Sequence, residues 1–218
     1  MTKPEKAAPA GFGLSDLEHD ALTELANIGV GRAATNLSRL VREQVFLSVP
    51  RTEVLALSVA AELLSRREPV DLVAVGQEFA GQFSGHALLI FPEANSFELV
   101  HAVVGSTVSM EEVADLEQEA LTEIGNVILN GCLVTVANTL KSSFRISLPQ
   151  LMRGSGRRIL ARDREDRPDD LVLFLTIDFE IRTRNLHGYI ALLMDLPSLS
   201  ALKSLIQQFI AGLGGKDD

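Results

Sequence analysis

Hydrophobic positions follow two different periods along the chain, and the same succession of periods occurs twice. Over residues 15–42 and 114–140, apolar side chains recur every three to four positions, which predicts two long amphipathic helices. The first of them begins with Ser15 and Glu18, which have the spacing of a capping box. A short run typical of a strand follows each helix, VFLSVP and FRISLP. The other predicted elements are helices over 52–67, 92–104 and 198–210 and strands over 72–79, 82–91, 171–181 and 186–196.

The order of these elements predicts an α+β fold, in which long helices pack on a mainly antiparallel sheet. A doubly wound sheet is the alternative, and the lack of tight β-α-β alternation weighs against it. The order in 15–112 recurs in 113–211, and SGHALLIFPEANSFELVHAVV aligns with LHGYIALLMDLPSLSALKSLI. We therefore expect one domain in which these two repeats share a core around a pseudo-twofold axis. Residues 1–14 are expected to form a disordered tail and 212–218 a C-terminal tail.

Composition restricts the class of protein. Hydrophobic residues make up 46% of the 218 residues and charged residues 22%, which is typical of a soluble globular protein. No run approaches the roughly 20 apolar residues of a membrane span, and the first residues do not form a signal peptide. The single cysteine, Cys132, excludes an intrachain disulfide and fits a reducing compartment. A cytoplasmic protein with no membrane partner is therefore expected.

Charge limits the partners further. The net charge is −9 at pH 7, so a broad basic face for nucleic acid is not expected. Arginines between residues 153 and 167 are interrupted by acidic residues, which favours a solvated polar loop over an anion site. The 4 histidines form no H-E-x-x-H or H-x-H pair, so no metal site is expected.

Both long helices carry the same set of polar residues. A Glu and an Asn three positions apart share one helix face, and a proline follows 23 positions after the Asn. Asn is a poor helix former, so its place within both helices has a cost. A shuffled chain would contain Glu-x2-Asn-x22-Pro about 0.02 times, whereas this chain contains it twice. A functional site is therefore favoured over two solvated helix faces with inherited symmetry. The members are Asp20, Glu24, Asn27 and Pro50 in the first half, and Glu119, Glu123, Asn126 and Pro149 in the second.

The pattern [Asp/Ser]-x3-Glu-x2-Asn-x22-Pro, present twice, resembles the CheC/CheX/FliY family of chemotaxis phosphatases. The resemblance extends from Asp16 to about Ile210, and two copies are more similar to two-site CheC than to one-site CheX. Glu119 departs from the pattern, because the family has Asp or Ser there. The resemblance implies a hydrolase of two-component signalling that acts on the phospho-aspartate of a CheY-like response-regulator receiver. It also implies that the receiver supplies Mg²⁺, that this chain holds no cofactor or metal, and that a CheD-like deamidase is a possible partner.

The resemblance and the chemistry of the side chains together suggest a role for each residue. An asparagine amide has both a donor and an acceptor, so Asn27 and Asn126 are expected to hold the attacking water in the receiver's active site. Glu24 and Glu123 are expected to pair with the receiver lysine and so to fix the register of the contact. The other expected roles are a rim contact for Asp20 and Glu119, and a structural role beside the helix for Pro50 and Pro149.

Other functions remain open at this stage. A non-catalytic adaptor that docks on a receiver or on another chemotaxis or flagellar switch protein would bind without accelerating hydrolysis. A small-molecule binder in the groove between the halves is a third possibility, which only the symmetry supports. Small residues on the two helices allow either a partner or a neighbouring helix to approach closely. These residues are Gly29, Gly31, Gly125 and Gly131.

Overall fold

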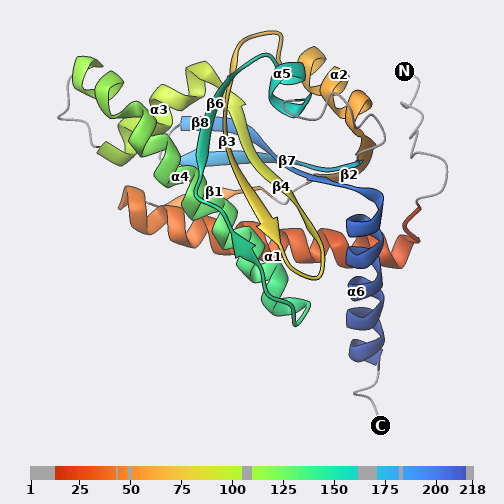
Figure 1. The fold of residues 1–218 in the computed structure, drawn as a ribbon. Helices are drawn as coiled ribbons and strands as arrows, with labels where there is room; N and C mark the ends of the chain where they lie inside the picture. Colours follow the sequence, from red (N-terminus) through yellow and green to blue (C-terminus); the bar gives the residue numbers. More distant parts are fainter. Residues whose placement is uncertain are drawn as a thin grey trace.

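The fold is an antiparallel sheet with helices on both faces (Figure 1). The computed structural model describes residues 13–42, 44–48, 51–104, 110–161, 171–181 and 184–214. In chain order the elements are α1 (Asp16–Val41), β1 (Val45–Leu47), β2 (Arg51–Ala56), α2 (Leu57–Arg67), β3 (Leu72–Ala80), β4 (Ser84–Pro92), α3 (Glu93–Val104), α4 (Met110–Thr139), β5 (Arg145–Ile146), β6 (Gln150–Gly154), α5 (Gly156–Ala161), β7 (Leu171–Ile181), β8 (Arg184–Met194) and α6 (Leu196–Gly214).

The sheet has eight strands in the order β1-β7-β8-β4-β3-β5, with β2 also paired to β7 and β6 also paired to β3. All of these pairs are antiparallel, which confirms the α+β prediction and makes the doubly wound alternative wrong. The order α-β-β-α-β-β-α occurs twice along the chain. The short strands of each half pair with a long strand of the other half, β1 and β2 with β7, and β5 and β6 with β3. The expected boundary between 112 and 113 lies inside α4.

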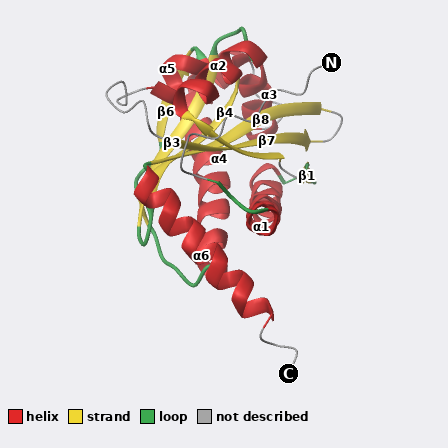
Figure 2. Cartoon of the chain, turned by 90° about the vertical axis from the view of Figure 1, so that its right-hand side faces the viewer, coloured by secondary structure: helices red, strands yellow, loops and turns green. Residues whose placement is uncertain are grey.

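Each long strand is buried on both faces because helices cover the sheet from two sides (Figure 2). In β3, Val73 faces a core formed with α1, α3, α4 and α6, whereas Leu72 and Ala74 face a core formed with α2 and α5. β7 alternates in the same way, with Leu173 on the first side and Phe174 on the second. Burial on both faces explains why these strands read as almost continuous apolar runs.

The small residues of α1 and α4 serve mainly to pack the protein itself. A Cβ atom on Gly29 would lie 3.3 Å from Cα of Cys132, and one on Gly131 would lie 3.2 Å from Cα of Ala33. These glycines therefore let the two long helices approach closely, as the packing alternative requires. Gly125 lies against Val75 of β3, and Gly31 alone of the four has open space around it.

Two predictions from local pattern are wrong. The helix expected over 52–67 begins only at Leu57, because residues 51–56 pair with β7 from Arg51–Thr176 to Ala56–Leu171. The solvated loop expected between residues 153 and 167 instead contains the end of β6 and the helix α5. Residues 162–170 of that stretch lie outside the described residues.

Two further details differ from the expectations. α6 continues to Gly214, beyond the predicted end at 210. The stretch Leu116–Thr139 of α4 is, by length and composition, apolar enough to cross a membrane, with a mean hydropathy of 1.5. The expectation that no run approaches this length is therefore wrong, although half of the most apolar window is buried inside the fold. α4 packs against α1, α3 and the sheet, as a core helix does.

Candidate functional site

The start of α1 is fixed by a capping box, as predicted. The Ser15 hydroxyl accepts from the Glu18 amide at 3.3 Å, and Glu18 Oε2 accepts from the Ser15 amide at 2.8 Å. Glu18 also accepts a hydrogen bond from Gln207 of α6 at 2.6 Å and lies 3.5 Å from Nζ of Lys203. The backbone hydrogen bond from Ser15 is the largest of the effects that lower the pKa of Glu18. α1 is therefore anchored to α6 just before its polar stripe begins.

The first polar stripe runs along the outer side of α1. Asp20 and Glu24 are exposed, and Asn27, one turn later, is half-buried. Glu24 and Asn27 make no side-chain hydrogen bond or ion pair with any other described residue. Beside the stripe, the hydroxyls of Thr23 and Thr52 lie 2.9 Å apart and attach α1 to β2. The first site thus presents, from a well-anchored helix, a carboxylate and an amide that have no side-chain partner in the part of the chain that the structure describes.

The second stripe has the same exposure but different support. Glu119 and Glu123 of α4 are exposed, without an ion pair inside the described ranges, and Asn126 is half-buried. Asn130, one turn further, donates from Nδ2 to Oδ1 of Asn126 at 2.6 Å. The Glu and Asn of each motif copy therefore share one helix face, as the i, i+3 spacing predicts.

Gln77 of β3 connects this second asparagine to the neighbouring turn. Its Nε2 donates to Oδ1 of Asn126 at 3.1 Å and to the Ser147 carbonyl at 3.0 Å. Ser147 is held again at Glu78, whose amide donates to the serine hydroxyl at 2.9 Å. Gln77 is only 2% exposed. Sequence reasoning missed this residue, and the signal was a polar side chain next to Glu78 in the otherwise apolar strand LVAVGQEFA.

The two prolines are placed differently by the structure. Pro149 is half-buried and follows Ser147 in the connection from β5 to β6, next to Leu148, which is 86% exposed. The hydrogen bonds of Ser147 to Gln77 and Glu78 hold this turn beside the helix that carries Asn126, and the structural role of Pro149 stays a prediction. Pro50 lies outside the described residues, so its predicted role remains a prediction.

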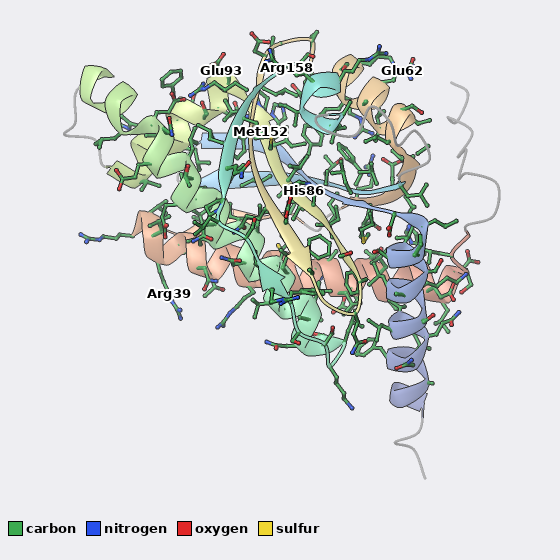
Figure 3. All side chains as sticks on the ribbon, viewed as in Figure 1. Arg39, Glu62, His86, Glu93, Met152 and Arg158 are labelled. Carbon is green, nitrogen blue, oxygen red and sulfur yellow. The ribbon has the colours of Figure 1, made fainter. Side chains whose placement is uncertain are left out.

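One cluster that the sequence did not suggest joins three elements. Arg153 of β6 pairs with Glu93 of α3 at 2.7 Å and with Glu117 of α4 at 2.5 Å. Glu117 is buried and accepts a further hydrogen bond from the Ser96 hydroxyl at 3.1 Å. Glu93 lies at the same end of the molecule as α5, whereas Arg39 extends outward from α1 (Figure 3). The cluster holds β6 and α3 on the start of α4.

Outside the two polar stripes, the described residues show no cluster of reactive side chains. Cys132 lines an apolar cavity between α1, α4 and the sheet, and burial raises the pKa of its thiol to about 12. Among the residues that the structure describes, no three His, Cys, Asp or Glu side chains are grouped as metal ligands would be. The cavity is lined by apolar side chains from both halves, including Leu25, Leu129 and Leu173. It offers no polar group to orient a ligand, so it adds no support to the small-molecule alternative.

Comparisons with known proteins agree with this arrangement. The family described as "Chemotaxis phosphatase CheX" matches residues 73–168, and the family described as "CheC-like family" matches residues 17–54. The flagellar motor switch phosphatase FliY of Bacillus subtilis is 24% identical over 211 residues, 96% of this chain and 53% of FliY. The putative CheY-P phosphatase CheC1 of Halobacterium salinarum is 24% identical over 187 residues, 85% of this chain and 92% of CheC1. This chain therefore spans about half the length of the first relative and most of the second.

A solved structure shares the fold. The crystal structure of Thermotoga maritima FliY superposes with a TM-score of 0.71 at 18% identity, covering 91% of this chain and 100% of that chain. At this identity the likeness concerns the fold alone. The two family models and the two relatives show that the chain is similar in sequence to CheC, CheX and FliY proteins.

Proposed function

We propose that this chain hydrolyses the phospho-aspartate of a CheY-like receiver domain, at two sites. In each site an asparagine, Asn27 or Asn126, positions the attacking water. A glutamate one turn earlier, Glu24 or Glu123, pairs with the receiver lysine. The names of the relatives support the activity class, since one is a flagellar motor switch phosphatase and another a putative CheY-P phosphatase.

One observation carries this proposal: each long helix presents an exposed carboxylate without an ion pair to another described residue and a half-buried amide on the same face. An exposed glutamate with no partner inside its own protein is available to a lysine from outside. A half-buried asparagine on a packed helix has a restricted position, which a residue that orients a water needs. Solvated helix faces need neither the repeated spacing nor the burial of the amide.

The chemistry divides between the two proteins. Phosphoryl transfer depends mainly on positioning and on charge stabilisation at the phosphorus. In this proposal the receiver supplies the phospho-aspartate, its lysine and Mg²⁺, and this chain supplies no cofactor. The carboxylate of Glu24 or Glu123 fixes the register through the lysine, and the amide then holds a water on the side opposite the aspartate oxygen. The water attacks the phosphorus, the bond to the aspartate oxygen breaks, and inorganic phosphate leaves.

The test is the single-turnover decay of a phosphorylated CheY-type receiver with Mg²⁺. The double variant Asn27→Ala/Asn126→Ala should leave the receiver decaying at its own rate, because both water-positioning amides are gone. Asn138→Ala is the matched control, since Asn138 is an exposed asparagine of α4 outside the stripe. A double variant as fast as the unaltered protein would refute the proposal.

The adaptor alternative gives a different result in the same assay. An adaptor would bind the phosphorylated receiver without shortening its lifetime, with or without the asparagines. The CheD-like partner, the rim contacts of Asp20 and Glu119, and a cytoplasmic location remain predictions within this proposal.

A further inference from the structure

We propose that Gln77 and Asn130 fix the orientation of the Asn126 amide and so make the Asn126 site the faster of the two. This inference rests on the phosphatase function proposed above. Gln77 and Asn130 are positioning residues, because they act through Asn126. The inference is based on a difference between the two sites: their helices carry the same motif, but the hydrogen bonds that support the asparagine side chain differ.

The buried glutamine determines which way the Asn126 amide points. The Ser147 carbonyl can only accept, so the Gln77 atom 3.0 Å from it must be the NH₂ group. The same NH₂ group faces Asn126, so the atom that it meets must be the acceptor Oδ1. The Ser147 carbonyl thus determines the orientation of the Gln77 amide, and the Gln77 amide determines that of Asn126.

Asn130 completes the arrangement. Its Nδ2 donates to the same oxygen at 2.6 Å, so both lone pairs of Asn126 Oδ1 are occupied. The Nδ2 group of Asn126 has no acceptor among the described residues, so both of its donors remain available. At this site the water would therefore be held by an N–H donor. A water that accepts such a bond keeps its second lone pair for the phosphorus.

The burial of Gln77 indicates that its position has a purpose beyond packing. Its Oε1 is buried and has no hydrogen-bond partner among the described residues. An unsatisfied buried oxygen is destabilising, and an apolar residue at this position would avoid the cost. The neighbours Val75 and Phe79 on the same face of β3 are apolar core residues. The unsatisfied Oε1 of Gln77 therefore has a cost in stability that an apolar residue at this position would not have.

Within the described residues, the first site has no counterpart of either supporting donor. The offset of 99 residues that relates Asn27 to Asn126 places Gly31 where Asn130 stands in the second site. On the sheet, Phe79 pairs with Ile146, and the corresponding pair of the other half is Phe179 with Leu47.

Two residues before these phenylalanines stand Gln77 and Ile177, both buried on the α1 and α4 side of the sheet. Glycine and isoleucine offer no side-chain hydrogen bond. Asn27 is accordingly without a side-chain hydrogen bond to any residue in the described ranges.

A fixed amide should react faster than a free one. Restraining one side chain before the partner binds removes an ordering cost from the reaction, about threefold to tenfold in rate. The Asn126 site is therefore expected to outpace the Asn27 site by about this factor. Asn27→Ala should consequently leave more activity than Asn126→Ala, and the reverse order would overturn the inference.

The decisive experiment measures Gln77→Met in two backgrounds, with a phosphorylated CheY-type receiver and Mg²⁺. Methionine keeps the length of the side chain and removes its amide. In Asn27→Ala protein, where only the second site works, the variant should slow decay of the phosphoryl group about threefold to tenfold. In Asn126→Ala protein it should change nothing. Equal rates in the first background, or an equal loss in both, would overturn the inference.

A gain of function provides the complementary test. No atom lies within 4 Å of the position that a Cβ on Gly31 would take, so there is room for a side chain to begin there, and Gly31→Asn introduces the missing donor. In Asn126→Ala protein this change should speed decay about threefold. No gain would count against the role of the residue one turn after the asparagine.

A structural readout separates this inference from the proposed function. The NMR order parameter of the Asn126 side-chain amide should fall in Gln77→Met protein, while that of Asn27 should not change. An unchanged Asn126 order parameter overturns the positioning role even if the protein is a phosphatase. Conversely, a fast Asn27→Ala/Asn126→Ala protein refutes the phosphatase proposal whatever the order parameters show.

Discussion

Gly125 of α4 lies so close to Val75 of β3 that a Cβ atom on the glycine would be 2.4 Å from the valine Cβ. This contact seats the helix that carries Glu123 and Asn126 directly on the sheet. It also explains why a residue with poor helix propensity lies in the middle of a long helix. Because Gly125 has no side chain, α4 can lie directly against β3. This close contact sets the position of the second site relative to β3 and to Gln77 on that strand.

Gly125→Ala should therefore destabilise the protein by about 1–3 kcal/mol, because the added methyl group overpacks the interface with Val75. Urea unfolding at equilibrium measures this change. Gly31→Ala on α1 is the matched control, since nothing lies within 4 Å of its Cβ position. That change should stabilise the helix by roughly 0.5–1 kcal/mol. Equal effects of the two substitutions would contradict the packing role.

Arg153→Ala should also destabilise the protein, by about 3 kcal/mol, because it leaves the buried carboxylate of Glu117 without the charge that pairs with it. The loss should appear as a lower midpoint of urea unfolding. Arg157→Ala, an exposed arginine four positions along, should stay within about 0.5 kcal/mol of the unaltered protein. If Arg153→Ala and Arg157→Ala changed the unfolding free energy equally little, Arg153 would behave as part of the solvated loop that the sequence suggested.

The elements that were predicted correctly and those that were predicted wrongly show what the local sequence pattern can and cannot provide. The long helices and the β3–β4 hairpin are strongly periodic, so the sequence alone was sufficient to predict them. β2 was mistaken for helix because its strand state depends on pairing with β7, which is more than a hundred residues away. α5 was missed because only two buried side chains, Ile159 and Leu160, distinguish it from a polar loop.

Lowering the pH should weaken the anchor of α1 at Glu18. The pKa of Glu18 in the folded protein lies below its ordinary value of 4.5, so the ionised side chain stabilises the folded state above that pH. This contribution is lost as the pH falls from 4.5 through the folded pKa. Glu18→Gln should cost about 1 kcal/mol near neutral pH and progressively less as the carboxylate becomes protonated. Urea unfolding as a function of pH measures the difference, and a constant difference would contradict a role for the charge.

The candidate site was only partly visible in the sequence, for a related reason. The i, i+3 spacing of Glu24 and Asn27 is a local property, and the structure shows both on one helix face. The partners of Asn126 are not local, because Gln77 lies on a strand of the other half. Two sites with the same motif therefore look equivalent in sequence, and their different support depends on the way the sheet joins the halves.

Removal of the two exposed carboxylates should weaken receiver binding without harming the fold. Glu24 and Glu123 make no ion pair with other described residues, so Glu24→Gln/Glu123→Gln should change the unfolding free energy by less than about 0.5 kcal/mol. Binding of a Mg²⁺-loaded CheY-type receiver should weaken about tenfold at low salt, because each site would lose the charge pair that we propose with the receiver lysine. The deficit should shrink as ionic strength rises, since salt screens the same attraction in the unaltered protein.

Glu62→Gln provides the control for this last prediction, because Glu62 is an exposed glutamate of α2 on the opposite face of the sheet. It changes the net charge of the protein in the same direction but lies far from both stripes in the fold. If Glu62→Gln weakened receiver binding as much per charge as the double variant, the effect would come from the overall charge of −9. A loss confined to Glu24 and Glu123 would place the lysine contact on the two polar stripes.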